Sequence, residues 1–105
     1  MQETQFDRER ILLGDEAIDF LKECHVAVFG VGGVGSFAAE ALARAGVGAI
    51  TLVDHDTVSL TNLNRQLVAL RSTLGMRKTD VMAERIRDIH PDCRVTVLPV
   101  FYEPE

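Results

Sequence analysis

The sequence predicts an α/β fold: a Rossmann-like parallel sheet in βαβαβ order, preceded by an N-terminal helical segment. Short apolar runs alternate along the chain with segments of helical period, which predicts parallel strands joined by right-handed crossovers. The run Gly-Val-Gly-Gly-Val-Gly at 30–35 follows the first apolar run and opens the next helix. Glycine turns at that place in a parallel sheet bind nucleotide phosphates, so the fold and a candidate site are predicted together.

The N-terminal part of the chain is expected to be helical and to lead into a strand. Residues 8–24 place Ile18 and Leu21 on one face of a helix, and Gly14 marks a break in it. His25–Phe29 is a short, nearly continuous apolar run. Such a run is typical of a strand that is buried on both faces of a sheet.

A helix and a second strand follow the glycine turn. Gly46 is expected to end the helix Gly33–Ala45, and Gly48 is expected to keep the turn tight before the strand Ala49–Val53. The apolar face of the helix is expected to consist of residues at offsets 0, 1, 4, 5 and 8, which are Phe37, Ala38, Ala41, Leu42 and Ala45.

The alternation resumes after a long polar segment. Residues 54–75 have no sustained period and are rich in Thr, Ser, Asn and Arg, which predicts a loop with short helical turns. Loops of this length in compact domains are usually functional or disordered. Residues 76–89 are expected to form an amphipathic helix that ends at His-Pro-Asp, and Arg94–Leu98 is the third strand. The buried face of that helix is expected to carry Met82, Ile86 and Ile89.

Composition and charge narrow the class of protein. The chain has 105 residues, 47% of them apolar and 26% charged, which fits one globular domain or part of one. Its net charge of −5 argues against a stand-alone nucleic-acid-binding module, whose footprint would be clustered Lys and Arg. Cys24 and Cys93 form no CxxC pair, and there is no signal peptide or long apolar run. A cytoplasmic protein without a membrane span is therefore expected.

The glycine run matches GxGxxG at Gly30, Gly32 and Gly35. The first glycine permits a tight turn, the second lets the backbone approach a phosphate, and the third lets the helix pack closely against the strand. Gly33 lies at the helix start, where free N–H groups favour an anion. Asp54 ends the second strand, 19 positions after Gly35, where a carboxylate accepts hydrogen bonds from ribose hydroxyls. NAD and ATP both fit these features, and a small-residue contact without a ligand is the simplest alternative.

The polar loop that follows favours ATP. It carries Asn62, Asn64 and Arg65, and Lys78 follows at the start of the next helix. An arginine and a lysine beside a bound triphosphate would neutralise the charge that develops as pyrophosphate leaves, whereas a hydride-transfer enzyme has no use for cations there. Taken singly, Arg65 could form a surface ion pair and Lys78 could lie on a solvated helix face.

At these residues the sequence resembles a known family. The motifs are GVGGVG, AGVGAITLVDHDTVSLTNLNRQ and the lysine at 78. Over residues 6–98 they resemble the ATP-dependent adenylating enzymes that include ThiF, MoeB and the ubiquitin-activating enzymes. The resemblance implies that Asp54 holds the ribose and that Asn62, Arg65 and Lys78 contact the phosphates. It also implies a homodimer in which Arg8 of one subunit reaches the ATP of the other.

The resemblance and the residue pattern together define the expected site. Asp56 is a candidate for assisting a metal ion or the ribose, and it could equally be an exposed loop acid. Arg10 is an alternative to Arg8. The expected nucleotide contacts are Gly30, Gly32, Gly33, Gly35, Asp54, Asp56, Asn62, Asn64, Arg65 and Lys78, and the expected catalytic residues are Arg65, Lys78 and the partner's Arg8.

Within the family, three segments resemble the branch of tRNA threonylcarbamoyladenosine dehydratases. They are RILLGDEAIDFLKECHVAVFGVGGVGSFAAEALARAGVGAI, NRQLVALRSTLGMRKTDVMAERI and IHPDCRVTV. The resemblance implies an enzyme that uses ATP and Mg2+ to activate the carboxylate of threonylcarbamoyladenosine in tRNA, which then closes into a cyclic form with loss of water. Three alternatives stay open: an enzyme that adenylates the C-terminal glycine of a ubiquitin-like sulfur-carrier protein, an NAD-dependent oxidoreductase, and a non-catalytic dimerising module.

The resemblance also implies that several parts of the site come after residue 105. These are the metal-binding acid, the zinc-binding CxxC pairs and any nucleophilic cysteine, so neither Cys24 nor Cys93 is expected to be a nucleophile. Three strands in the order 3-2-1 would leave His25–Phe29 as an apolar edge. We therefore expect residues 1–105 to be the N-terminal part of an adenylating domain, with helices in 1–24 and the nucleotide-binding half in 25–105, and to be inactive alone.

Overall fold

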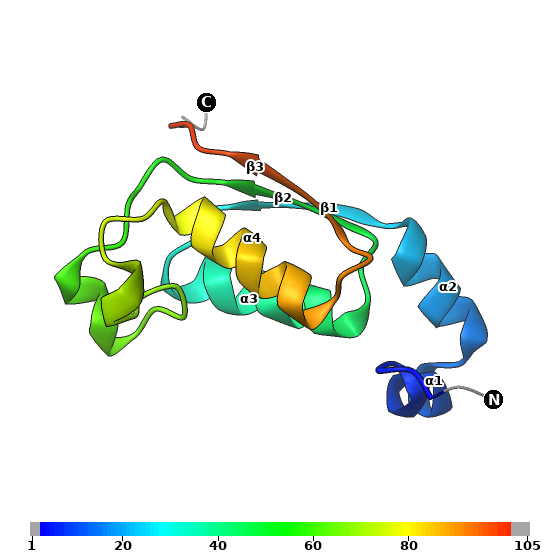
Figure 1. Cartoon of the computed structure of the whole chain (residues 1–105). Coiled ribbons are helices and arrows are strands. Elements are labelled where there is room, and N and C mark those ends of the chain that lie inside the picture. The colour runs from blue at the N-terminus through cyan, green and yellow to red at the C-terminus, as the bar shows by residue number, and fades with distance from the viewer. Residues whose placement is uncertain (1–2, 102–105) are drawn as a thin grey trace.

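The structure is a computed structural model that describes residues 3–101 (Figure 1). The order of its elements, βαβαβ after two N-terminal helices, confirms the predicted α/β class. The elements are α1 (Asp7–Leu13), α2 (Asp15–Glu23), β1 (His25–Phe29), α3 (Gly33–Ala45), β2 (Ala49–Val53), the 3-10 helices η1 (Leu60–Asn64) and η2 (Arg71–Thr73), α4 (Lys78–Ile89) and β3 (Arg94–Leu98).

Three parallel strands form one sheet in the order β1-β2-β3, which confirms the expected order. His25 pairs with Ala49, and Ala49 pairs with Arg94, so the three strands start level with one another. Helices α3 and α4 lie side by side on one face of this sheet (Figure 1). The carboxyl ends of the strands therefore share one edge, and the glycine turn and the polar loop both leave from it.

Strand β1 differs from the expectation, because it is not buried on both faces. His25, Ala27 and Phe29 are exposed, and the two valines between them are half-buried. The exposed side chains lie on the face of the sheet away from the helices, where with Thr51 they help to line a hollow of about 450 Å³. His25 Nε2 and Thr51 Oγ1 lie 2.6 Å apart on this face. The apolar run predicted the strand correctly, but it carried no information about which faces are covered.

Helix α3 has the predicted bounds but a different buried face. Phe37 is 55% exposed and Ala41 is exposed, whereas Ser36, Ala39 and Ala43 are buried. At 100° per residue, the buried residues centre roughly 160° from the predicted face, which is nearly the opposite side of the helix. The helix is rich in alanine, so its apolar residues extend almost all the way round and their period does not define a face. Small side chains on the inner face let the helix approach the sheet closely.

Helix α4 buries the face that was predicted for it. Met82 and Ile86 are fully buried, and Ile89 is half-buried. They belong to the same apolar core as Ile50 and Leu52 of the central strand. This core lies between the sheet and the two helices and holds the carboxyl edge of the sheet in place.

The polar loop contains the short helical turns that were predicted, η1 and η2. It also contains an isolated antiparallel bridge between Thr57 and Arg77, which was not predicted. Arg77 is extended in this bridge, so α4 begins at Lys78 and not at residue 76 as expected. The bridge closes the loop at its base and brings the residues after Asp54 next to the start of α4.

Helices α1 and α2 form an arm at the end of the molecule opposite the polar loop (Figure 1). Gly14 separates them, as expected, with φ of +86°. The segment before α1 returns to the helix layer, where the Phe6 ring meets the His90 ring edge-to-face at 5.1 Å. At Gly48 an added Cβ would lie 1.8 Å from the carbonyl oxygen of Lys22, so only glycine fits this turn.

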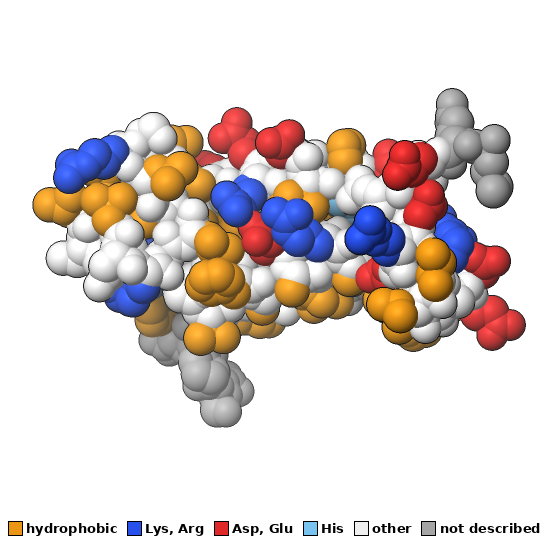
Figure 2. Space-filling view, turned by 90° about the horizontal axis from the view of Figure 1, so that it is seen from below, with side chains coloured by type: hydrophobic (Ala, Val, Ile, Leu, Met, Phe, Trp, Pro, Cys, Tyr) orange, Lys and Arg blue, Asp and Glu red, His pale blue; other side chains and the backbone are white. Residues whose placement is uncertain are grey.

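Apolar and charged side chains divide the surface of the helix layer. Lys and Arg side chains form a row along its middle, interrupted by acids, and apolar side chains gather at both ends (Figure 2). Exposed apolar residues of the arm are Ile11, Leu12, Leu13 and Phe20, and those of the loop include Leu60, Leu70 and Leu74. Over residues 3–101, no helix combines the length and apolar character needed to cross a membrane.

Candidate functional site

The glycine turn joins the end of β1 to the start of α3 and is fixed by two close contacts. Gly30 has φ of +91°, a left-handed conformation that favours glycine, and its N–H donates to the carbonyl oxygen of Val53 (2.8 Å). An added Cβ at Gly35 would lie 1.7 Å from the carbonyl oxygen of Gly30, so the helix could not approach the strand with any other residue there. At Gly33 nothing lies within 4 Å of an added Cβ, and the first turn of α3 has no acidic residue. The start of the helix is thus open and suited to an anion.

Asp54 links the glycine turn to the end of β2. Its side chain is buried; Oδ2 accepts a hydrogen bond from the Val31 N–H (2.6 Å), and Oδ1 accepts one from the Asp56 N–H (2.9 Å). These bonds fix the carboxylate beside the phosphate turn. Each carboxylate oxygen can accept a further hydrogen bond, so the position suits the predicted contact with ribose hydroxyls.

The polar loop folds back onto the glycine turn through Gln66. An added Cβ on Gly32 would lie 3.6 Å from Gln66 Nε2, so the Gln66 amide borders the space in front of the second glycine of the turn. Asn62, four residues earlier, is buried, and its Oδ1 accepts hydrogen bonds from the N–H (2.9 Å) and hydroxyl (3.1 Å) of Ser59. Half of the Asn62 amide therefore caps η1, and a phosphate contact would fall to its Nδ2 group.

Arg65, which directly follows η1, is held by neighbouring residues of the polar loop and has no acidic partner in the described chain. Its Nη1 donates to the carbonyl oxygen of Thr61 (3.1 Å) and to Asn64 Oδ1 (3.0 Å). Among residues 3–101, no carboxylate lies within ion-pair distance of this guanidinium. The alternative of a surface ion pair is therefore wrong within the described chain. Asn64 acts here as a support for Arg65.

Lys78, the first residue of α4, is a buried cation at the same edge. Its side chain is 8% exposed, and its Nζ lies 3.9 Å from Asp56 Oδ2. Its backbone N–H donates to the Asp56 carbonyl oxygen (3.1 Å). The alternative of a solvated helix face is therefore wrong. A buried ammonium group whose one carboxylate partner lies 3.9 Å away can bind a further anion.

Three side chains at the end of β2 are candidate ligands for Mg2+. Asp54, His55 and Asp56 each offer one ligand atom, and these atoms lie within 4.8 Å of one another. Mg2+ prefers oxygen ligands and commonly takes one or two carboxylates together with phosphates. Asp54 is buried and held by two backbone N–H groups, which limits the approach of a hydrated ion, and imidazole is a poor Mg2+ ligand. The exposed carboxylate of Asp56 is the group in this cluster that fits the ion.

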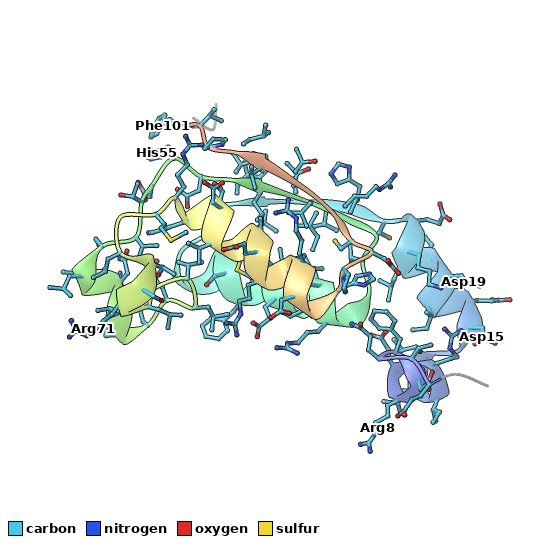
Figure 3. All side chains as sticks on the ribbon, in the orientation of Figure 1. Arg8, Asp15, Asp19, His55, Arg71 and Phe101 are labelled. Atoms are coloured by element: carbon cyan, nitrogen blue, oxygen red, sulfur yellow. The ribbon has the colours of Figure 1, made fainter. Side chains whose placement is uncertain are left out.

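Arg8 is not brought to the site within one chain. It lies on α1, and its side chain points outward at the far end of the molecule from His55 and Phe101 (Figure 3). The alternative residue, Arg10, forms an ion pair with Asp15, with an Nη1–Oδ1 distance of 2.7 Å. The structure therefore leaves Arg8 exposed on the arm, and its predicted contact with the nucleotide of a partner subunit stays a prediction.

Sequence analysis missed Gln66, and it expected no nucleophile among the cysteines. Gln66 stands next to Arg65 in the motif, but no period or charge distinguishes it, and only the folded loop places it on the turn. Cys93 is buried, and burial raises the pKa of its thiol, which disfavours the nucleophilic thiolate. Cys24 is half-buried, and no disulfide joins the two.

Comparison with known proteins supports this arrangement. The sequence model of the ThiF family matches residues 6–105. A tRNA threonylcarbamoyladenosine dehydratase of Bacillus subtilis is 58% identical over 101 residues, which is 96% of this chain and 40% of the relative. A molybdopterin-synthase adenylyltransferase of Salmonella typhimurium is 40% identical over 98 residues, 91% of this chain and 39% of the relative.

A solved structure has the same fold. The crystal structure of the E. coli tRNA N6-threonylcarbamoyladenosine dehydratase in complex with ATP superposes with a TM-score of 0.90 at 55% identity, and the match covers 92% of this chain and 40% of that one. The chain thus spans about 40% of the length of these relatives. Because the family model covers nearly the whole chain, the chain belongs to the ThiF family.

Proposed function

We propose that the protein carrying this chain is an ATP-dependent adenylating enzyme whose substrate is threonylcarbamoyladenosine in tRNA. The observation that carries the proposal is the pair of cations at the carboxyl edge of the sheet: buried Lys78 and Arg65, which has no acidic partner in the described chain. Arg65 directly precedes Gln66, whose amide borders Gly32 of the glycine turn. Lys78 directly follows Arg77, which pairs with Thr57 at the base of the polar loop. NAD also carries a pyrophosphate, but hydride transfer leaves it intact, so cations that neutralise a leaving pyrophosphate favour the adenylating reaction.

The proposed reaction has two steps. A substrate carboxylate oxygen forms a bond to the α-phosphorus of ATP, and the bond from that phosphorus to the bridging oxygen breaks, so that pyrophosphate leaves. Ring closure at the activated carbonyl then releases AMP, and the nucleoside has lost water overall. Arg65 and Lys78 neutralise the charge that grows on the phosphates in the first step. Mg2+ supplies further charge neutralisation when bound, with Asp56 as its contact in this chain.

The choice of substrate rests on similarity. This chain is 58% identical to a tRNA threonylcarbamoyladenosine dehydratase and 40% identical to a molybdopterin-synthase adenylyltransferase. We therefore place the sulfur-carrier alternative second. We further propose a cytoplasmic homodimer, in which residues 1–105 form the N-terminal part of the adenylating domain and Arg8 of one subunit reaches the nucleotide of the other.

The test uses the full-length protein with ATP, Mg2+ and tRNA that carries threonylcarbamoyladenosine. After digestion of the tRNA to nucleosides, mass spectrometry is expected to show the modified nucleoside with the mass of one water lost, and only when ATP is present. No mass change, together with pyrophosphate exchange that depends on a sulfur-carrier protein, would contradict the tRNA substrate and support the second candidate.

A further inference from the structure

Gln66 has a backbone that fixes the direction of its side chain. Its N–H donates to the carbonyl oxygen of Asn62 (3.0 Å), and its own carbonyl oxygen accepts from the Ala69 N–H (3.0 Å). Both bonds belong to the turn that ends η1, so the residue lies between Arg65 and the next buried segment of the loop. A side chain on such a backbone has few directions open to it, and this one runs to the glycine turn.

The side-chain amide lies flat over Gly32. An added Cβ on Gly32 would lie 3.6 Å from Gln66 Nε2, 3.8 Å from its Cδ and 3.9 Å from its Oε1. Three nearly equal distances mean that the face of the amide, and not one edge, is turned toward the space in front of Gly32. Its polar edges are left for other partners. In a glycine turn of this kind, the phosphates approach the backbone at the second glycine.

The polar atoms of this amide have no partner within the described chain. Oε1 is buried without a hydrogen-bond partner, and no hydrogen bond joins Nε2 to another residue of 3–101. Burying an amide oxygen without a partner is costly, and unpaired polar atoms of native proteins are commonly found at functional sites. Glu9 and Thr79 also carry such atoms, but Gln66 carries its own on a side chain that borders the phosphate turn.

We infer that Gln66 is a further nucleotide-binding residue, whose Nε2 donates a hydrogen bond to a phosphate oxygen above Gly32 and whose Oε1 accepts one from a ribose hydroxyl. A nucleotide offers both groups at this position, since phosphates only accept and ribose hydroxyls donate. Gln66 thereby joins the polar loop to the glycine turn through the ligand. The inference rests on the proposed function, because it needs a nucleotide at the turn.

The test compares Gln66→Met with wild type in the full-length protein, using thermal melts without nucleotide and calorimetric titration with ATP and Mg2+. Methionine keeps the length and volume of the side chain and removes both polar atoms. The midpoint without ATP is expected to stay unchanged or to rise by about 1–3 °C, because an unpaired oxygen is removed. The Kd for ATP is expected to rise about tenfold, as for the loss of hydrogen bonds to a charged group. Gln66→Glu, which puts a negative charge beside the phosphates, is expected to weaken ATP binding further.

Gln5→Met is the matched control, because the amide of Gln5 has a partner away from the site, the carbonyl oxygen of Ile89 (2.9 Å). It is expected to leave the Kd for ATP unchanged. A lower melting midpoint in Gln66→Met with an unchanged Kd would show that Gln66 only supports the loop, and would overturn the inference. Failure of the wild-type protein to bind ATP would instead overturn the proposed function, so the two failures are distinguishable.

Discussion

At the scale of single residues, the structure explains why particular side chains, or none, occupy the glycine turn. Gly35 is required by packing, since an added Cβ would overlap the carbonyl oxygen of Gly30. Gly33 has open space in front of it, and its role is access to the helix start. These two glycines, two positions apart in the same motif, thus have different physical reasons: packing requires Gly35, whereas Gly33 lies at an open helix start.

Gly35→Ala is expected to destabilise the protein by about 3 kcal/mol or more, because the new methyl group would overlap the rigid backbone of Gly30. The midpoint of urea unfolding of the full-length protein measures this. Gly33→Ala is the matched control for stability alone. It lies at the start of α3 with no neighbour in reach, and its unfolding free energy is expected to change by less than about 1 kcal/mol. Equal effects of the two substitutions would contradict the packing account.

The loop residues show what sequence could predict at this scale. Asp54, Arg65 and Lys78 are charged residues at defined places after a strand, in the polar loop and at a helix start, which is why the sequence could single them out. The structure places Asp54 beside the glycine turn and Lys78 beside Asp56. The position of Gln66 in front of Gly32 depends on how the loop folds, and no local pattern encodes that path. The cap between Ser59 and Asn62 is instead a local contact between residues three apart, of the capping-box type.

At the scale of elements, turn residues and clear helical periods predicted helix ends and buried faces correctly, whereas a segment of uniform composition did not. Gly46 ends α3 in the left-handed conformation (φ +98°), as its place after the last apolar residue indicated. The face of α4 was correct because its apolar residues are few and well separated. The face of α3 was wrong because alanines surround it, and the start of α4 was wrong because a long-range bridge at Arg77 extends the chain there.

The contact between α3 and α4 is stabilised by an ion pair with a defined pH dependence. Glu40 on α3 accepts a hydrogen bond from Arg85 on α4, and Arg44 Nε lies 3.5 Å from the other carboxylate oxygen of Glu40. The hydrogen bond from Arg85, with the charges of both arginines, holds the pKa of Glu40 below its ordinary value of 4.5. The carboxylate therefore stabilises the folded state above that value, and the contribution is lost as the pH falls through the lowered pKa.

Glu40→Gln is expected to lower the free energy of unfolding by about 1 kcal/mol at pH 7, because it removes the charge from a partly buried pair. The difference from wild type should shrink as the pH falls below 4.5. Urea unfolding at several pH values measures it. Glu84→Gln on the exposed face of α4 is the control, since Glu84 has no ion pair within residues 3–101. A difference that did not depend on pH would contradict the role of the Glu40 charge.

At the scale of the whole molecule, the sheet separates a nucleotide edge from an N-terminal arm. The polar loop lies at one end of the molecule, and α1 and α2 lie at the other (Figure 1). Arg8 sits on that arm with its side chain outward (Figure 3). The Arg8 of a chain and its own Lys78 therefore lie far apart, which is the arrangement expected if each site in a homodimer takes its arginine from the partner subunit.

Mixing two inactive variants tests this exchange between subunits. Arg8→Ala and Lys78→Ala full-length proteins are each expected to be inactive. After unfolding and refolding together, half of the dimers would contain one copy of each, and one site in each such dimer would have both residues. About a quarter of wild-type activity is expected to return. No recovery, with dimers formed normally, would show that Arg8 does not act on the partner's site.

The central claim is that the edge formed by the glycine turn, Arg65 and Lys78 binds ATP and breaks its α–β phosphate bond. Exchange of labelled pyrophosphate into ATP, measured on the full-length protein with tRNA that carries threonylcarbamoyladenosine, tests it most directly. Wild type is expected to exchange only when that tRNA is present. In Arg65→Ala and in Lys78→Met, the rate of pyrophosphate exchange is expected to fall about 100-fold or more. Arg71 is an exposed arginine of the same loop, and Arg71→Ala is expected to exchange at nearly the wild-type rate. Near-normal exchange in both site variants, or tight NADH binding without ATP binding, would contradict the account.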